Sequence, residues 1–555
     1  MALVYFIILI GIVVFVHELG HFLCAKAFDV KVLKFSLGFG PRLFGFQKGE
    51  TEYLISALPF GGYVKMLGDD PNAVLEPEER RRSFYGQEPY RRFCITLAGP
   101  LMNLVFPMLL FFGVHAADNR VLPAVVGMVL EGDPADRAGI RDGDRIAAVN
   151  GEPIAAFEDL QRKVEPSAGR PLRITVEREG KRFDVTVTPK EEVTRDPLDT
   201  ESRVGRIGVI TGQFEPIIGV RRMDSPAGLA GLRSFDKVVS VNGVQVATFQ
   251  AMMREIARSN AQPVRIAYLR PAASKLAPPF ENVYGKTTSE AALTPSMDNG
   301  NVVTGIEPSS LYMAFVDPKG PAAGIGLVPG DRLVSIDGVP VRVWSELLVK
   351  LQSNPTKPHT LAWEHEGQQR ESRSYQPAGL DPSQGISFGS ELYEPGMRPY
   401  ASMKPPSPVA HPDRFSRAFR LSIEETWDIA RLTVLGIVRL AQGRISLKTI
   451  GGPILIGDLA GAAGSQGVGT FLWVMALISI NIGLINLFPI PVLDGGHMLL
   501  SLIESARKKP MSTRTREVLQ TVGLVLLLSL MALAMKNDLE RYWPRIAAWF
   551  MGVFG

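Results

Sequence analysis

His17-Glu18-Leu19-Gly20-His21 lies inside an apolar run from Leu3 to Ala25 near the start of the sequence. Residues four apart share one face of a helix, so the two histidines can present imidazoles to one Zn²⁺, with Glu18 beside them as a general base. The same pattern also occurs by chance on soluble helices as an ordinary charged face. Here that alternative would bury these polar groups in hydrocarbon, at about 2.5–3.5 kcal/mol per charged group. The placement therefore predicts an intramembrane zinc site.

Composition indicates a membrane protein with a large soluble part. The chain has 555 residues, 46% of them hydrophobic and 21% charged, so it is too long for one domain and too charged to lie wholly in a membrane. A net charge of +4 is too small to argue for nucleic acid as a partner. The two cysteines, Cys24 and Cys94, lie in apolar runs and indicate neither a disulfide framework nor a CxxC metal site.

Four segments are apolar over the roughly 17–25 residues that a spanning helix needs. They are Leu3–Ala25, Phe93–Val114, Phe471–Phe488 and Val518–Met535. The first has no basic stretch before it, and its nearest positive charge, Lys26, follows it, so we expect a retained span and not a cleaved signal.

Basic residues predict the orientation. The segment between the first two spans carries Lys26, Lys31, Lys34, Arg42, Lys48, Lys65, Arg80, Arg81, Arg82, Arg91 and Arg92, and the one between the last two carries Arg507, Lys508, Lys509, Arg514 and Arg516. By the positive-inside rule both are cytoplasmic, and residues 115–470 are outside. At 1.5 Å per residue, His21 and His17 lie about 7 Å and 13 Å from Lys26, so the zinc site belongs to the cytoplasmic half of the membrane.

A third metal ligand is expected where the third span ends, in Asn486-Leu487-Phe488-Pro489-Ile490-Pro491-Val492-Leu493-Asp494-Gly495-Gly496-His497. Two prolines break the helix there, and non-helical backbone is tolerated at membrane depth only beside protein or a water-filled cavity. Asp494 is the anionic ligand at the matching depth. His497 is the rival ligand, and a capping turn formed by Asp494 at the interface is the structural alternative.

Together these residues resemble the site-2 protease family of intramembrane zinc metalloproteases, in the form that activates sigma-E in bacteria and carries PDZ domains. The family has HExxH in its first core span and NxxPxxxxDG in its third, and Asn486, Pro489, Asp494 and Gly495 match the second pattern. The resemblance implies one zinc ion per chain, held by His17, His21 and Asp494. It extends to Ser36–Pro41 and Leu58–Met66, which are similar to a membrane-associated β-loop, and to Gly99-Pro100 with Asn103.

The resemblance also implies substrate-binding residues. Gly38, Gly40, Gly61 and Gly62 would lie in the β-loop, and pairing with that loop would replace the hydrogen bonds that a helical substrate loses when it unwinds. Asn481 and Asn486 would hold the substrate backbone near the metal. Their structural alternative is ordinary hydrogen bonding between membrane helices.

The outer segment contains three copies of one motif. Asp133–Ile146 with Asn150-Gly151 recurs as Ser225–Leu232 with Asn242-Gly243, and again as Gly320–Leu333 with Asp337-Gly338. Each copy resembles the bacterial PDZ signature, in which a short helix flanks a groove able to bind a peptide strand. Three copies exceed the one or two that relatives often carry, and some copies are equally expected to be spacers or steric gates with blocked grooves.

We therefore expect a polytopic α-helical membrane protein with about four transmembrane helices, a membrane-associated β-loop and extracytoplasmic α+β PDZ-like domains. The expected divisions are helix 1 at 1–28, the β-loop region at 29–92, helix 2 at 93–116, PDZ-like domains at 117–213, 214–272 and 301–378, linkers at 273–300 and 379–414, an amphipathic extracytoplasmic region at 415–468, helix 3 at 469–498, helix 4 at 518–536 and an interfacial tail at 537–555.

The predicted function is zinc-dependent endoproteolysis inside the bacterial inner membrane. The resemblance implies regulated intramembrane proteolysis of anti-sigma factors or remnant signal peptides, on transmembrane substrates already cut by a site-1 protease. Other expected partners are the lipid bilayer and peptide ligands of the PDZ-like domains. The alternative is a non-catalytic membrane scaffold that presents PDZ domains and keeps zinc for structure. Three protein ligands plus Glu18 leave a water position open, which favours the enzyme because structural zinc normally has four protein ligands.

Overall fold

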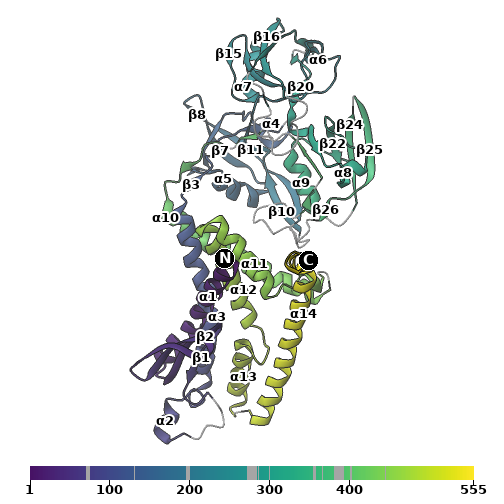
Figure 1. Cartoon of the computed structure of the whole chain (residues 1–555). Coiled ribbons are helices and arrows are strands. Elements are labelled where there is room, and N and C mark those ends of the chain that lie inside the picture. Colours follow the sequence, from purple (N-terminus) through teal and green to yellow (C-terminus); the bar gives the residue numbers. More distant parts are fainter. Residues whose placement is uncertain are drawn as a thin grey trace. The chain divides into compact units, whose positions relative to one another are not determined.

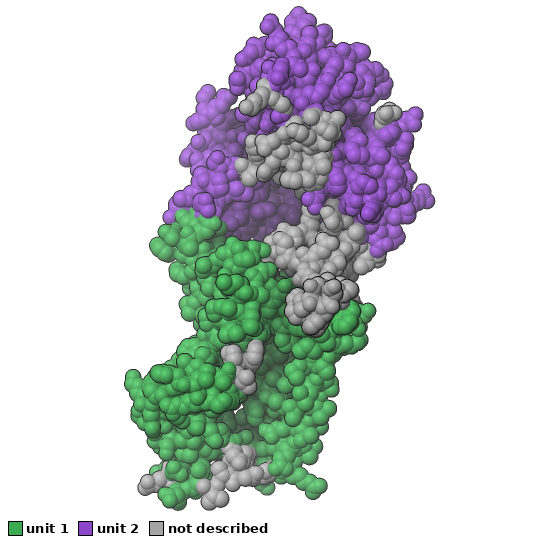
Figure 2. All heavy atoms as spheres, in the orientation of Figure 1, with its two compact units in different colours: residues 1–119, 381–388, 413–555 green, residues 120–380, 389–412 purple. Residues whose placement is uncertain are grey.

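A computed structural model describes residues 1–69, 75–130, 132–195, 201–271, 284, 287–298, 301–353, 358–365, 367–379, 393–394, 396–399, 403–404, 406–443, 446–509 and 511–554. The chain forms two compact units (Figure 2). Unit 1 contains residues 1–119 and 413–555 with a short piece at 381–388 that lies outside the described residues, and unit 2 contains residues 120–380 and 389–412.

Unit 1 is helical apart from one β-hairpin (Figure 1). Its helices are α1 (Ala2–Ala27), α2 (Pro77–Arg81), α3 (Pro89–Ala117), α10 (Arg414–Ala441), α11 (Pro453–Gln466), α12 (Val468–Asn486), α13 (Asp494–Arg507) and α14 (Thr513–Phe554), with a 3₁₀ turn at Leu447–Thr449. Four of these helices, α1, α3, α12 and α14, are long and apolar enough to cross a membrane. This finding confirms four apolar spans of the expected kind.

Small residues allow the spans to pack closely around α3. A Cβ on Gly20 of α1 would lie 2.3 Å from the Ala98 carbonyl oxygen, and one on Gly483 of α12 would lie 3.0 Å from Asn103 Cβ. Ser479 Oγ also donates to the Asn103 carbonyl, at 2.9 Å. Close helix approach through small residues is typical of membrane bundles. Through these contacts both α1 and α12 pack against α3.

The hairpin consists of β1 (Val32–Lys48) and β2 (Thr51–Met66), and each strand folds back on itself. Phe35 pairs with both Val64 and Tyr53, and Tyr53 pairs in turn with Phe46. The two strands therefore make four sheet segments in the order 62–66, 32–37, 51–56 and 42–48. Gly38, Gly40 and Gly61 have φ of 92°, 86° and 127°, which glycine adopts without the steric cost of a Cβ, and they lie at the bends.

Unit 2 contains three repeats, each built on a four-stranded antiparallel sheet. The first repeat has β3 (Arg120–Val121), β4 (Met128–Val129), α4 (Pro134–Arg137), β5 (Arg145–Val149), β6 (Glu152–Pro153), α5 (Phe157–Val164), a 3₁₀ turn (Glu165–Ser167), β7 (Leu172–Arg178), β8 (Lys181–Val187), β9 (Lys190–Arg195), β10 (Glu201–Arg206), β11 (Val209–Ile210) and β12 (Gln213–Phe214). The second has β13 (Ile218–Val220), α6 (Pro226–Leu229), β14 (Lys237–Val241), β15 (Val244–Gln245), α7 (Phe249–Arg258), β16 (Val264–Leu269), β17 (Ser289–Leu293), β18 (Ser296–Asp298), β19 (Asn301–Val303) and β20 (Ile306–Pro308). The third has a 3₁₀ turn (Ser309–Leu311), β21 (Met313–Val316), α8 (Pro321–Gly324), β22 (Arg332–Ile336), β23 (Val339–Pro340), α9 (Trp344–Ser353), β24 (His359–His365), β25 (Gln368–Tyr375), β26 (Ala378–Gly379), β27 (Tyr393–Glu394) and β28 (Met397–Pro399), followed by β29 (Met403–Lys404) and β30 (Val409–Ala410).

The sheets have equivalent strand orders, namely β6-β5-β7-β8, β15-β14-β16-β17 and β23-β22-β24-β25. The hairpin turns are equivalent as well, because Asn150, Asn242 and Asp337 all have positive φ and each is followed by a glycine with positive φ. This is the geometry of a type I′ turn. The side chain of each turn residue accepts a backbone N–H from a residue 23 positions later, at 2.8–2.9 Å.

Each repeat also buries one aspartate against a basic residue 34 positions later. Arg178 pairs with Asp144 and Arg270 pairs with Asp236, while the third repeat has His365 on Asp331. The three aspartates are at most 2% exposed. The sequence repeat therefore corresponds to a repeat of packing and hydrogen bonding.

Three expected divisions differ from the structure. Part of the linker expected at 273–300 is a strand, because β17 pairs with β16 and buries Ala291 and Leu293; residues 272–283 lie outside the described residues. Helix 3, expected at 469–498, ends at Asn486, and Asp494 begins the separate helix α13, because Pro489 and Pro491 interrupt the segment. The tail expected from residue 537 continues α14 as one helix to Phe554.

The region expected to be amphipathic at 415–468 contains two different helices. In α10 Arg417, Ala418, Ser422 and Thr426 are buried, whereas Phe415, Phe419 and Trp427 are 62–68% exposed. In contrast, α11 packs Ala460 and Ala463 against Leu9 and Val13 of α1. The second helix is thus part of the bundle core, which the sequence analysis did not anticipate.

Candidate metal centre

Three ligand atoms from two distant parts of the chain meet inside unit 1. His17 Nε2 and His21 Nε2 lie 3.2 Å apart on one face of α1. Asp494 Oδ2 lies 3.1 Å from the first and 3.5 Å from the second. The three side chains are 11%, 12% and 19% exposed. Within the part of the chain that the structure describes, this is the group of His, Cys, Asp and Glu residues placed to hold a metal ion.

Helix α3 orients His21. The Nδ1–H of His21 donates to the carbonyl oxygen of Ile95 in α3, at 2.8 Å. In the neutral ring this bond leaves the Nε2 lone pair of His21 for a metal. Gly99 makes the necessary space, because a Cβ there would lie 2.3 Å from His21 Nε2.

Asn103 of α3 orients His17. Its side-chain amide lies against His17 Nδ1, with Nδ2 at 3.3 Å, while its buried Oδ1 has no hydrogen-bond partner. If the amide is turned over, its Oδ1 accepts the Nδ1–H of the ring. That arrangement leaves His17 Nε2 unprotonated and directed at Asp494.

Asp494 reaches the histidines because the chain turns tightly before it. Helix α12 ends at Asn486, Pro489 and Pro491 prevent it from continuing, and α13 begins at Asp494. A Cβ on Gly495 would lie 2.3 Å from the carbonyl oxygens of both Leu487 and Phe488. Glycine after Asp494 is thus required by the close approach of the backbone.

These residues fit a zinc ion. Two ligands about 2.0–2.1 Å from a tetrahedral Zn²⁺ lie about 3.3 Å from each other, and the three observed separations of 3.1, 3.2 and 3.5 Å bracket that distance. Two oriented imidazoles and one carboxylate are a ligand set typical of catalytic zinc. Among the described residues no fourth His, Cys, Asp or Glu joins the group, so one coordination position is left for water or substrate.

Glu18 lies between the histidines and the hairpin. A Cβ on Gly62 would lie 3.1 Å from Glu18 Cγ, and the Glu18 carboxylate makes a backbone hydrogen bond with Val64. The metal ligands and segment 62–66 of β2 therefore flank the same carboxylate.

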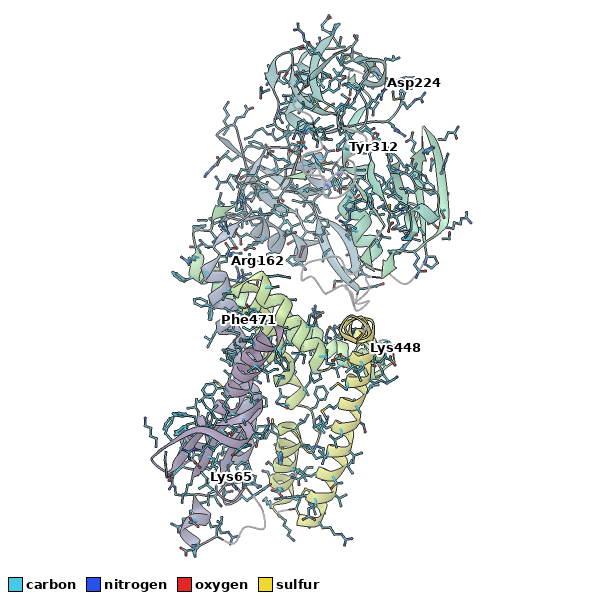
Figure 3. All side chains as sticks on the ribbon, in the orientation of Figure 1. Lys65, Arg162, Asp224, Tyr312, Lys448 and Phe471 are labelled. Atoms are coloured by element: carbon cyan, nitrogen blue, oxygen red, sulfur yellow. The ribbon has the colours of Figure 1, made fainter. Side chains whose placement is uncertain are left out.

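In the side-chain view Lys65 lies toward the end of unit 1 opposite Phe471 and Lys448 (Figure 3).

The other residues named from the sequence have different positions. His497 lies on α13 one turn beyond Asp494 and is outside the metal group, although it lines a small buried cavity with Arg92 and Glu504. Asn481 accepts a hydrogen bond from Thr433 Oγ1 of α10 at 2.8 Å, which is the bond between helices that the sequence analysis kept as its alternative. Asn486 is the last residue of α12. Gly38, Gly40 and Gly61 lie at the bends of the hairpin, whereas Gly62 contacts Glu18.

The residues that orient the two histidines had no predicted role. Asn103 and Gly99 were noted only as part of a resemblance, and Ile95 acts through its backbone carbonyl, which has no sequence signal. Polar and small residues at 99 and 103 in an otherwise apolar span are the signal that could have identified two of them.

Comparisons with known proteins identify a family of peptidases, with zinc metalloproteases among the relatives. The family model described as peptidase family M50 matches residues 5–530. A provisionally named zinc metalloprotease of Neisseria meningitidis is 30% identical over 540 residues, which cover 97% of this chain and 98% of the relative. The regulator of sigma-E protease RseP of Escherichia coli is 28% identical over 541 residues, with 97% and 98% covered. A provisionally named zinc metalloprotease of Thermotoga maritima is 27% identical over 548 residues, with 96% and 97% covered.

Proposed function

Because the chain belongs to peptidase family M50, the site-2 protease family, and is therefore a zinc metalloendopeptidase, we propose that His17, His21 and Asp494 hold its zinc and that it cuts transmembrane segments of other proteins. The observation that carries this proposal is the meeting of the three ligand atoms inside a helical unit with four membrane-length helices. A substrate peptide bond is proposed to reach that position from within the bundle or the surrounding bilayer. The alternative of a non-catalytic scaffold does not agree with membership of a peptidase family.

A zinc ion held by His17, His21 and Asp494 would supply a Lewis acid and would lower the pKa of a bound water molecule. Glu18 accepts the proton of the attacking water and passes it to the leaving amine. Its position supports this role, since it follows His17 directly and lies between the metal ligands and β2. Asn103 and the Ile95 carbonyl keep both imidazoles aimed at the metal while the proton moves.

A helical substrate must unwind before its carbonyl reaches the metal, because its backbone groups are bonded within the helix. Segment 62–66 of β2 pairs with β1 on one side and lies beside Glu18. We propose that its other edge, with Gly61 and Gly62, pairs with the unwound substrate, and that the bends at Gly38 and Gly40 shape that edge. Asn486 at the end of α12 is proposed to hold the substrate backbone. For Asn481 this role would require exchange of its bond to Thr433.

The cellular setting is proposed from charge and resemblance. The basic segments that precede α3 and α14 support a cytoplasmic position for the hairpin and α13 at a bacterial inner membrane, with unit 2 outside. The Escherichia coli relative is named a regulator of sigma-E protease, which supports an anti-sigma factor as substrate. Remnant signal peptides are the second substrate class, and in both classes a site-1 protease would cut first.

The three repeats of unit 2 are proposed to be PDZ-like domains. In the first repeat a cavity of about 850 Å³ lies beside α5 and β11, and Val339–Val343 of the third repeat forms part of its lining. A groove between a helix and a strand is suited to adding a peptide strand. Because residues of the third repeat line part of this groove, we propose that they limit the access of a peptide to it. This agrees with the alternative that some repeats are steric gates with blocked grooves.

The test uses the purified full-length protein. We expect one zinc per chain by elemental analysis and cleavage of a single-span substrate within its apolar segment, located by mass spectrometry of the products. The same preparation carrying Glu18→Gln should give no product. Zinc-loaded, unmutated protein that cuts only outside apolar segments would contradict the proposal.

A further inference from the structure

A buried ionic cluster lies at the end of unit 1 where α13 ends and α14 begins (Figure 1). Glu504 of α13 is 3% exposed. Its Oε2 accepts a hydrogen bond from Arg92 Nη2 of α3 at 2.7 Å. Its Oε1 accepts from Arg516 Nη2 of α14 and from the backbone N–H of Met511, the latter at 2.9 Å. We call Tyr85, Arg92, Glu504 and Arg516 the inner cluster.

Tyr85 completes the inner cluster with its ring. The guanidinium carbons of Arg92 and Arg516 lie 5.5 Å and 4.7 Å from the centre of this ring, within the range of cation–π attraction. Arg92 and Arg516 are 7% and 8% exposed. A buried carboxylate with this many donors has a strongly preferred geometry, and removing its charge leaves two buried guanidinium groups without a counter-ion.

The inner cluster bears on the metal centre because Glu504 and Asp494 belong to one helix. Ten residues separate them, or about 15 Å along the axis of α13. The loop before Asp494 is held as well, since a Cβ on Gly523 of α14 would lie 3.1 Å from Pro491 Cδ. The element that carries the third ligand is thus fixed at its far end by charge and at its near end by close packing.

Helix α3 contacts both histidines and also the helix that carries Asp494. It orients His21 through Ile95 and His17 through Asn103, and its Arg92 holds Glu504. Arg92 lies one turn from Ile95 on the same helix. A movement of α13 along α3 would therefore carry Asp494 away from the two histidines.

We propose that Glu504 is a positioning residue for zinc, because the ion pairs that it makes with Arg92 and Arg516 hold α13 where Asp494 meets His17 and His21. This inference rests on the proposed ligand set. It assigns a function to an ion pair distant from the metal, and it predicts that zinc affinity depends on it.

The experiment measures the zinc dissociation constant of the detergent-solubilised full chain by competition with a chromophoric chelator. Glu504→Gln keeps the size of the side chain and removes its charge. We expect it to weaken zinc binding roughly 10–100-fold, as loss of an orienting partner typically does. Glu504→Asp, which keeps the carboxylate, should lie between this variant and the unmutated protein.

The matched control is Asp538→Asn at the other end of α14. Asp538 is fully buried and accepts backbone N–H groups of Gly452, Ile454 and Leu455 at 2.9–3.0 Å. This substitution should lower the unfolding temperature of the zinc-free protein and leave zinc affinity unchanged. A role of Glu504 in stability alone would make Glu504→Gln behave in the same way, and that result would overturn the proposal.

Asp494→Ala is measured in parallel, so that a failure of the Glu504 proposal can be distinguished from a failure of the proposed ligand set. Lowered zinc affinity in Asp494→Ala with unchanged affinity in Glu504→Gln overturns this inference alone. Unchanged affinity in Asp494→Ala overturns the proposed ligand set and the inference with it. If Glu504→Gln does not fold, Arg516→Lys decides, because it keeps the charge and loses the guanidinium fork. Weakened zinc binding in that variant supports the proposal, and unchanged binding overturns it.

Discussion

At the scale of single residues, the proposed centre assigns metal binding and proton transfer to different side chains. His17 and His21 point the same ring atom at Asp494, and α3 engages the opposite atom of each ring. Glu18 lies on the neighbouring side of α1, toward Gly62. Substitution of Glu18 should therefore change the catalytic rate without changing the zinc content.

Glu18→Gln should keep zinc and lose activity. The amide has nearly the same volume but does not accept a proton, and loss of a general base typically costs about 10²–10⁴-fold in rate. Zinc content by elemental analysis and cleavage rate on one substrate measure the two quantities. A variant as active as the unmutated protein would remove Glu18 from the mechanism.

Asp494→Ala should lower both zinc content and activity, whereas His497→Ala should leave the metal bound. Asp494 Oδ2 lies within 3.5 Å of both Nε2 atoms, and His497 is outside the group of ligand atoms. Elemental analysis of the two purified variants, made side by side, is the measurement. The ligand set is wrong if His497→Ala loses the metal and Asp494→Ala keeps it.

At the scale of elements, the three repeats of unit 2 differ in the basic residue that pairs with their buried aspartate. In the first two, the arginine paired with the buried aspartate also donates to a glycine carbonyl, Arg178 to Gly139 and Arg270 to Gly231. In the third repeat His365 occupies the equivalent position and bonds to Asp331. In the third repeat a single imidazole nitrogen of His365 therefore makes the bond that a two-pronged arginine guanidinium makes in the other two repeats.

His365→Arg should stabilise the third repeat by about 1 kcal/mol, since an arginine at this position would make a charge-assisted bidentate pair and reach a backbone carbonyl. Slower hydrogen exchange in β22 and β24 of the full chain would report the effect. Arg178→His is the matched control and should speed exchange in β5 and β7. Faster exchange around Asp331 in His365→Arg would contradict the equivalence of the repeats.

At the scale of the whole molecule, unit 2 is inserted between α3 and α10 and is therefore tethered to unit 1 at both ends. The helices α1 and α13, which carry the proposed metal ligands, lie in unit 1. We propose that this insertion hinders a substrate that carries a bulky folded outer domain. A steric filter would explain dependence on an earlier cut without tight peptide binding.

Replacing residues 122–377 with a flexible linker should allow cleavage of an uncut, full-length substrate in membranes. The expected product appears because the obstacle to a large outer domain has been removed, and Glu18→Gln in the same deletion should abolish it. Immunoblotting of the substrate follows the product. A stable, zinc-loaded deletion that still cuts only shortened substrates would refute the filter.

Much of this protein was determined by its sequence alone, because the signals are local. Two histidines four residues apart predict a shared helix face, apolar runs of about 20 residues predict spans, and repeated Asn-Gly or Asp-Gly turns predict equivalent hairpins. The family match confirms the resemblance to site-2 proteases, the zinc cofactor and the peptidase class. The PDZ identity of the repeats and the substrate-binding glycines and asparagines stay predictions.

Only the tertiary structure showed that the three expected ligands meet, and which neighbouring groups hold them in place. His21 and Asp494 are hundreds of residues apart, and the choice of Asp494 over His497 depends on where α13 begins after two prolines. Asn103, the Ile95 carbonyl and Glu504 acquire their roles from the close approach of α1, α12 and α13 to α3. That approach is set by packing at glycines such as Gly20, where the backbones of α1 and α3 come near enough to exclude a larger side chain. A local sequence pattern does not specify which helix will be the neighbour.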